Sequence, residues 1–160
     1  MTAPVDDPEA LAAKRVYDMI LLRLRDEQGI HAETALCAAG AVTGRAIGQA
    51  AAEDRLGAVA TTVAYLRDRC EALGVAIPDS DALPLDSGVS HRTPEALAAE
   101  LQPEVAEILA SLNVSPDRAV FVVARTIPAL LSGCRGVIDS SAGYGIAVQA
   151  LHRCVRTYSS

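Results

Sequence analysis

The stretch AAGAVTGRAIGQAAA, residues 38–52, places glycines at positions 40, 44 and 48. Residues four apart lie on one face of an α-helix, so the three glycines predict a bare stripe along a helix. A glycine inside a helix costs about 1 kcal/mol relative to alanine. Close approach of a second helix backbone can offset that cost through dispersion contacts. The stretch therefore predicts a buried helix that another helix crosses closely.

The partner of this glycine stripe has three interpretations. Small residues recur near the end of the chain, at Ser132, Gly136, Ser140, Gly143 and Ala147. They favour a crossing within the chain, against the last helix or the one before it. A stripe of this kind also suits a self-complementary seam in a two-fold dimer. The third interpretation is a ligand that lies against bare backbone.

Three helix starts share a pattern of a capping residue, a proline and an acid: Asp7-Pro8-Glu9, Thr93-Pro94-Glu95 and Ser115-Pro116-Asp117. The first residue can cap free backbone N–H groups, and proline suits the first helical position. The acid stabilises the positive end of the helix dipole. These patterns predict helices that begin at residues 8, 94 and 116.

The apolar periodicity completes the prediction of the fold. It predicts helices over 8–28, 31–53, 58–73 and 141–158, besides those that begin at 94 and 116. We expect Pro103 to cut the fourth helix into two pieces and Pro128 to kink or break the fifth. Residues 77–92 predict a long loop. The whole is a single domain, residues 1–160: a compact all-α bundle of about six helices with the glycine-striped second helix buried at its centre.

Composition narrows the classes of function. The net charge of −6 argues against general nucleic-acid binding, which needs a basic surface. The charge is uneven, however: residues 118–160 carry +4 and residues 1–117 carry −10. This asymmetry predicts either that the basic part docks on the acidic part or that the basic part holds an anion.

The cysteines and the ends of the sequence bear on location. Cys37, Cys70, Cys134 and Cys154 lack metal-binding spacing, so we expect reduced thiols, no metal and no cofactor. The acidic N-terminal stretch has no apolar core of a signal peptide. The two most apolar segments, 35–52 and 119–138, contain arginines that are costly in a membrane. We expect a cytoplasmic protein that binds no membrane.

Two arginines are the candidate ligand-binding residues, Arg125 and Arg135. Arg125 follows six apolar residues, so its guanidinium must reach solvent, pair with an acid or bind an anion. Glu33, on the otherwise apolar second helix, is the partner we expect for it. A ligand carboxylate or phosphate is the alternative, because arginine recognises such groups with two parallel hydrogen bonds.

No known catalytic motif occurs in the sequence, so catalytic residues are not assigned and enzymatic activity stays open. The first hypothesis is a structural or protein-interaction domain that forms a homodimer. Its seam would use the second helix or the last one, where Tyr144, Val148, Leu151, Val155 and Tyr158 repeat at spacings of four and three. The second hypothesis is a binder of, or an enzyme acting on, a small anionic molecule held by Arg125 and Arg135.

Overall fold

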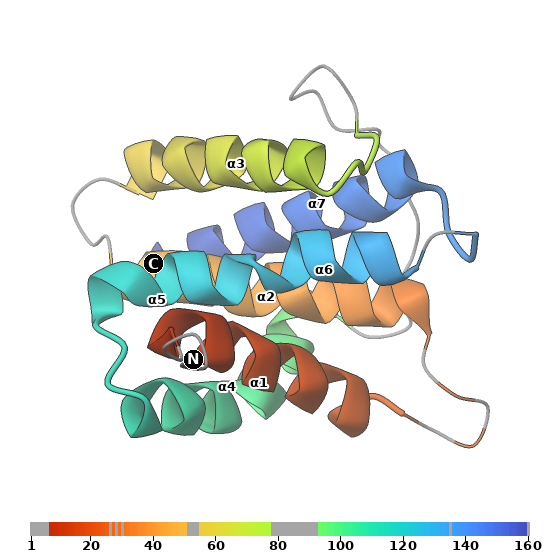
Figure 1. Ribbon diagram of the computed structural model, residues 1–160. Helices are drawn as coiled ribbons and strands as arrows, with labels where there is room; N and C mark the ends of the chain where they lie inside the picture. The colour runs from red at the N-terminus through yellow and green to blue at the C-terminus, as the bar shows by residue number, and fades with distance from the viewer. Residues whose placement is uncertain are drawn as a thin grey trace, which may run out of the picture.

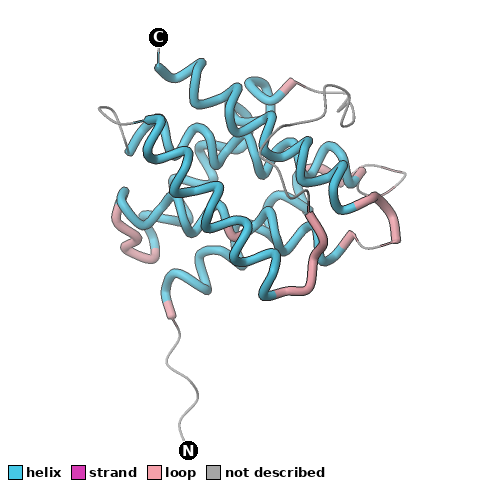
Figure 2. Tube along the Cα trace, turned by 90° about the horizontal axis from the view of Figure 1, so that it is seen from above, coloured by secondary structure: helices cyan, strands magenta, loops and turns pink. Residues whose placement is uncertain are grey.

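The computed structural model describes residues 7–25, 27, 29, 31–50, 55–77, 93–134 and 136–159, with only the backbone described at 55 and 156–159. The helices are α1 (Pro8–Arg23), α2 (Ala32–Ala50), α3 (Arg55–Ala72), α4 (Pro94–Ser111), α5 (Pro116–Ala124), α6 (Thr126–Gly133) and α7 (Ser140–Ser159). The described residues contain no β-strand, as Figure 2 shows. The fold is an all-α bundle, as predicted.

Helix α2 lies at the centre of the bundle. In Figure 1, α5 and α6 run in front of it, α1 and α4 lie below, and α7 runs between α2 and α3. The packing of α2 against α7 is the most extensive among the described helices. One hydrophobic cluster draws residues from all of these helices. The predicted central position of the second helix is therefore confirmed.

The glycine stripe explains how α2 and α7 come so close. A Cβ atom at Gly40 would lie 2.0 Å from the carbonyl oxygen of Ala147, and one at Gly44 would lie 2.3 Å from that of Leu151. Real side chains essentially never approach a backbone oxygen at such distances. At these two positions the crossing lies within the chain, which is the first of the three interpretations.

Helix α7 buries its apolar side against this crossing. Tyr144, Val148, Leu151 and Val155 are 1%, 3%, 0% and 6% exposed. The apolar repeat that suggested a seam between two chains is therefore buried within a single chain. The side chain of Tyr158 lies outside the described residues.

All three predicted helix starts are confirmed. The carboxylate of Asp7 accepts from the backbone N–H of Glu9 at 3.0 Å, and the hydroxyl of Thr93 accepts from that of Ala96 at 3.2 Å. Ser115 precedes α5 without a side-chain capping bond.

Helix ends are less accurately predicted. The first helix ends at Arg23 rather than near residue 28, and the buried Leu24 closes it with a bond from its N–H to the carbonyl of Ile20. Beyond it, Arg25 and Glu27 are exposed, so a further turn would bury no apolar face. The predicted loop of 77–92 lies outside the described residues except for residue 77.

The two helix prolines act differently. Pro103 was expected to cut the fourth helix, and this was wrong: α4 continues through it. Pro103 and Ala99, whose carbonyl loses its partner, are both exposed, so water can satisfy that carbonyl. Pro128 does break the fifth helix, and α5 ends one residue before Arg125.

Candidate functional site

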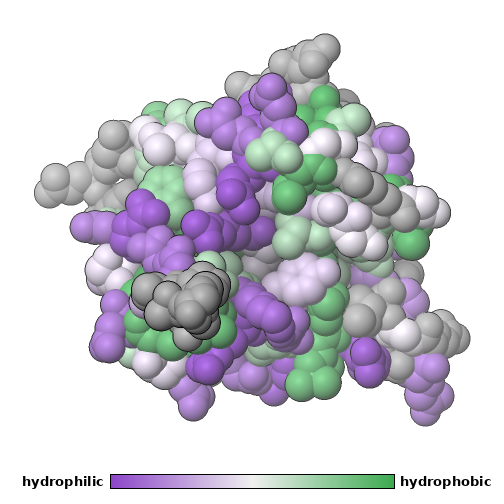
Figure 3. Space-filling view, viewed as in Figure 1, coloured by the Kyte–Doolittle hydropathy of each residue, from purple (hydrophilic) through white to green (hydrophobic). Residues whose placement is uncertain are grey.

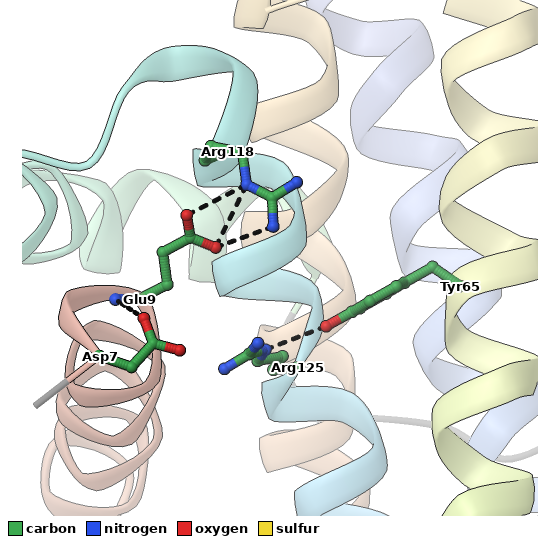
Figure 4. A network of polar contacts seen from close by, with 5 residues as sticks. All are labelled: Asp7, Glu9, Tyr65, Arg118 and Arg125. Atoms are coloured by element: carbon green, nitrogen blue, oxygen red, sulfur yellow. Dashed lines mark hydrogen bonds and ion pairs between the residues drawn. The ribbon is translucent and has the colours of Figure 1, made fainter. Parts of the chain in front are cut away.

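Arg125 occupies the junction between α5 and α6. Its Nε donates a hydrogen bond to the hydroxyl of Tyr65 on α3 at 3.0 Å (Figure 4). The ring of Tyr65 meets the ring of Phe121 edge to face, with centroids 5.1 Å apart. The half-buried guanidinium of Arg125 therefore links the α5–α6 junction to α3 by a hydrogen bond.

Local chemistry creates this junction. Pro128 has no N–H to donate to the carbonyl of Ala124, which interrupts the helical hydrogen bonds. The buried hydroxyl of Thr126 donates to the carbonyl of Val123 at 2.7 Å and satisfies one freed acceptor. The backbone N–H of Arg125 still donates to the carbonyl of Phe121. Arg125 is therefore the one residue that separates α5 from α6.

A second arginine of α5 lies beside this junction. Both Nε and Nη2 of Arg118 donate to the carboxylate of Glu9 on α1, at 2.9–3.2 Å. Figure 4 shows Glu9 and Asp7 approaching from α1 while Tyr65 approaches from α3. The hydrogen bonds from Arg118 lower the pKa of Glu9 below its ordinary value of 4.5.

The charge asymmetry of the sequence is partly explained by such pairs. Arg118 on α5 binds Glu9, and Arg153 on α7 binds Glu95 on α4 at 2.6 Å. Both arginines belong to the basic last part of the chain, and both acids belong to the acidic first part. For these two arginines, docking of the basic part on the acidic part is the interpretation that holds.

Glu33, the predicted partner of Arg125, does not pair with it. Glu33 lies in the first turn of α2, near Cys134, whose thiol pKa is raised by burial and by the charge of Glu33. Cys134 and Arg125 flank opposite ends of α6, whose eight residues span about 12 Å. The structure therefore replaces the expected Glu33 pair with a hydrogen bond to Tyr65. Arg135 lies outside the described residues, so its place in the site is untested.

Arg125 keeps one property that an anion site needs. Within the described part of the chain, no carboxylate lies within 4.0 Å of its guanidinium. Its hydrogen-bond partner is the hydroxyl of Tyr65 rather than a carboxylate. The positive charge of Arg125 is therefore hydrogen-bonded but not neutralised by an ion pair there.

A second candidate site is a groove of about 340 Å³ between α3 and α7. Its lining is mainly apolar: Leu56, Val59, Ala60, Val63, Ala64, Arg67, Tyr144, Val148 and His152. At one end the guanidinium of Arg67 lies over the ring of Tyr144, 5.7 Å from its centroid. The pairing of a residue late in α3 with one early in α7, and the opposite directions of the two helices in Figure 1, show that α3 and α7 run antiparallel.

One rim of the groove is an exposed apolar row, Leu56, Ala60 and Ala64, which we call the α3 stripe. The three residues are four apart and all exposed, and Leu56 is 86% exposed. Residues 56–66 contain no charged side chain. Surfaces that bind other proteins are depleted of charge at their core, whereas ordinary exposed helix faces are charged.

Sequence reasoning missed the α3 stripe. It used the apolar periodicity of residues 58–73, which belongs to the inward face of the same helix, where Val59, Leu66 and Cys70 are buried. The uncharged run of residues 56–66 was the available signal, because it leaves no charged face for solvent. By contrast, Figure 3 shows hydrophilic and hydrophobic residues interleaved on the face formed by α1, α5 and α6.

Other classes of site find no support in the described residues. No group of three or more His, Cys, Asp or Glu side chains there could hold a metal ion. No described helix has the length and apolar character needed to cross a membrane. Burial raises the pKa of the Cys70 thiol to about 11 and that of Cys154 to about 12, which leaves both unreactive. No protein family, characterised protein or solved structure was found to match this chain.

Proposed function

We propose that this chain is a helical protein-interaction domain that pairs with a second copy of itself. The observation that carries the proposal is the α3 stripe, an uncharged and exposed helix face beside an apolar groove. Leu56, at the rim of this groove, is 86% exposed. A partner that covers it removes apolar surface from water, which stabilises the complex.

The proposal moves the seam from the helices first expected to α3. The apolar side chains of α7 and the glycines Gly40 and Gly44 of α2 are engaged inside the chain, so a partner cannot reach them. The α3 stripe is an apolar helix face that stays accessible. The buried thiols of Cys70 and Cys154, which form no disulfide, support a reducing compartment, which we take to be the cytoplasm.

Sedimentation equilibrium over a concentration series tests the proposal. We expect the wild type to sediment as a dimer and Leu56→Asp to sediment as a monomer, because the aspartate would place a charge in the seam. Leu22→Asp is the matched control, since Leu22 is also an exposed leucine, at 71%, but lies on α1. It should leave the dimer intact.

Two results would contradict the proposal. A wild type that stays monomeric at every concentration removes the homodimer. A dimer that Leu56→Asp leaves intact removes α3 as its surface. Circular dichroism of both variants shows that they are folded.

Anion binding is the second candidate function, and Arg125 is the residue that favours it. The support is a half-buried guanidinium with no carboxylate within 4.0 Å in the described part of the chain. Arg135, the second cation expected for such a site, lies outside the described residues. Phosphate and citrate should raise the melting temperature of the wild type but not that of Arg125→Met. If neither anion raises it for the wild type, this candidate is excluded for those ligand classes.

A further inference from the structure

The α3 stripe has an order of sizes along the helix. It begins with the large Leu56 and continues with the small Ala60 and Ala64. The two alanines leave room in which a facing side chain can settle, whereas Leu56 projects from the helix. The stripe therefore contains a projection at one end and a depression at the other.

These sizes match when the stripe faces a reversed copy of itself. In an antiparallel pair centred on Ala60, Leu56 of each copy lies opposite Ala64 of the other. In a parallel pair, Leu56 would meet Leu56, and the alanines would face each other across a gap. Antiparallel pairing is the one that fills the space.

The charges on α3 favour the same direction. The charged residues described at its C-terminal end are Arg67, Asp68, Arg69 and Glu71, all beyond the uncharged run of 56–66. Of these, Arg67 and Glu71 share the face of the stripe, and a parallel pair would bring each of them close to its own copy, which is repulsive. An antiparallel pair centred on Ala60 keeps Arg67 and Glu71 of one copy far from the same residues of the other.

We propose that two copies of the chain join by packing α3 against α3 in antiparallel directions, with a two-fold axis at Ala60. The inference rests on the proposed homodimer and adds its contact surface, direction and register. Leu56 of the second copy covers Ala64 and fills the part of the groove next to Tyr144. The interface is isologous, so it closes at two copies.

Cysteine cross-linking tests this arrangement. Two variants, Ala60→Cys and Glu71→Cys, are made in a Cys134→Ser background, because the other three cysteines are buried. Both positions are exposed on α3. The two thiols introduced at position 60 lie at the axis of the dimer, within disulfide range of each other. The two thiols introduced at position 71 are each 11 residues from the axis, so they are roughly 33 Å apart at 1.5 Å per residue.

The expected result under mild oxidation is a disulfide-linked dimer for Ala60→Cys and none for Glu71→Cys. Cross-linking of both variants overturns the antiparallel direction. Cross-linking of neither, while the wild type sediments as a dimer, overturns α3 as the seam. A wild type that sediments as a monomer instead contradicts the proposed function itself, so the two failures are told apart.

Discussion

Gly40 allows α2 and α7 to approach closely, because a Cβ atom there would lie 2.0 Å from the carbonyl oxygen of Ala147. We predict that Gly40→Ala lowers the free energy of unfolding. Helix propensity alone would raise it by about 1 kcal/mol, but overpacking typically costs about 1–3 kcal/mol. Thermal unfolding of the two proteins measures the sign. A rise in melting temperature would contradict the close crossing.

The glycine spacing predicted the stripe but could not identify its partner. Spacing shows which residues share a face of one helix, and it carries no information on which other helix lies opposite. The small residues of α7 pointed to the correct partner, and the dimer seam was an equally self-consistent choice. Only the positions of Ala147 and Leu151 across from Gly40 and Gly44 distinguish them.

Arg125 and Tyr65 should be energetically coupled. In a double-mutant cycle with Arg125→Met and Tyr65→Phe, we expect a coupling free energy of about 1 kcal/mol, below the usual range of about 1.5–3 kcal/mol for charged hydrogen bonds because the pair is partly solvated. Urea denaturation of the four proteins provides the measurement. Glu33→Gln combined with Arg125→Met serves as the control and should be additive. Additivity of Arg125 with Tyr65, or coupling with Glu33, would refute this geometry.

The mistaken pairing of Arg125 with Glu33 has a physical origin. Both residues interrupt apolar stretches, so sequence reasoning joined the two charges. Which of them meet depends on the register between α2 and the α5–α6 segment, and no local pattern encodes that register. The phenol of Tyr65 was overlooked because a neutral partner does not stand out by charge.

Glu9 should make stability sensitive to acid. The pKa of its carboxyl is lowered in the folded state by the hydrogen bonds from Arg118. The ion pair therefore stabilises the fold fully above the ordinary pKa of 4.5, and this contribution is lost as the pH falls through the lower folded pKa. We predict that Glu9→Gln melts below the wild type at neutral pH and that the difference closes in acid. A difference that stays constant with pH would exclude the ion pair as its cause.

At the scale of single elements, helix starts were predictable and interruptions were not. A capping residue and a proline act within one turn, so Asp7 and Thr93 mark their helices locally. Whether an internal proline ends a helix depends on what surrounds it. Pro103 lies on a solvent-facing side of α4, whereas Pro128 is buried next to a junction that Thr126 stabilises.

Pro103 offers a direct test of this view. We predict that Pro103→Ala raises the free energy of unfolding by about 1–3 kcal/mol, because alanine restores a helical hydrogen bond to the carbonyl of Ala99 and removes a steric clash. Urea denaturation measures the change. A lower stability would mean that packing of α4 depends on the proline.

For the whole molecule, composition and periodicity were enough to predict an all-α bundle with α2 at its centre. They were not enough to locate an interaction surface. In the sequence, the apolar side of α7 has the pattern of a seam between two chains. In the structure, that side is buried by the crossing with α2. The α3 stripe became visible only when exposure was known, because exposed alanine and leucine residues are common on protein surfaces.

Isotope-filtered NMR on a mixture of labelled and unlabelled chains detects contacts between α3 of one copy and α3 of the other. We expect nuclear Overhauser effects between the methyl groups of Leu56 in one copy and that of Ala64 in the other, with Ala60 contacting its own counterpart. Intermolecular effects that link Leu56 to Leu56, or that arise only from helices other than α3, would contradict this pairing.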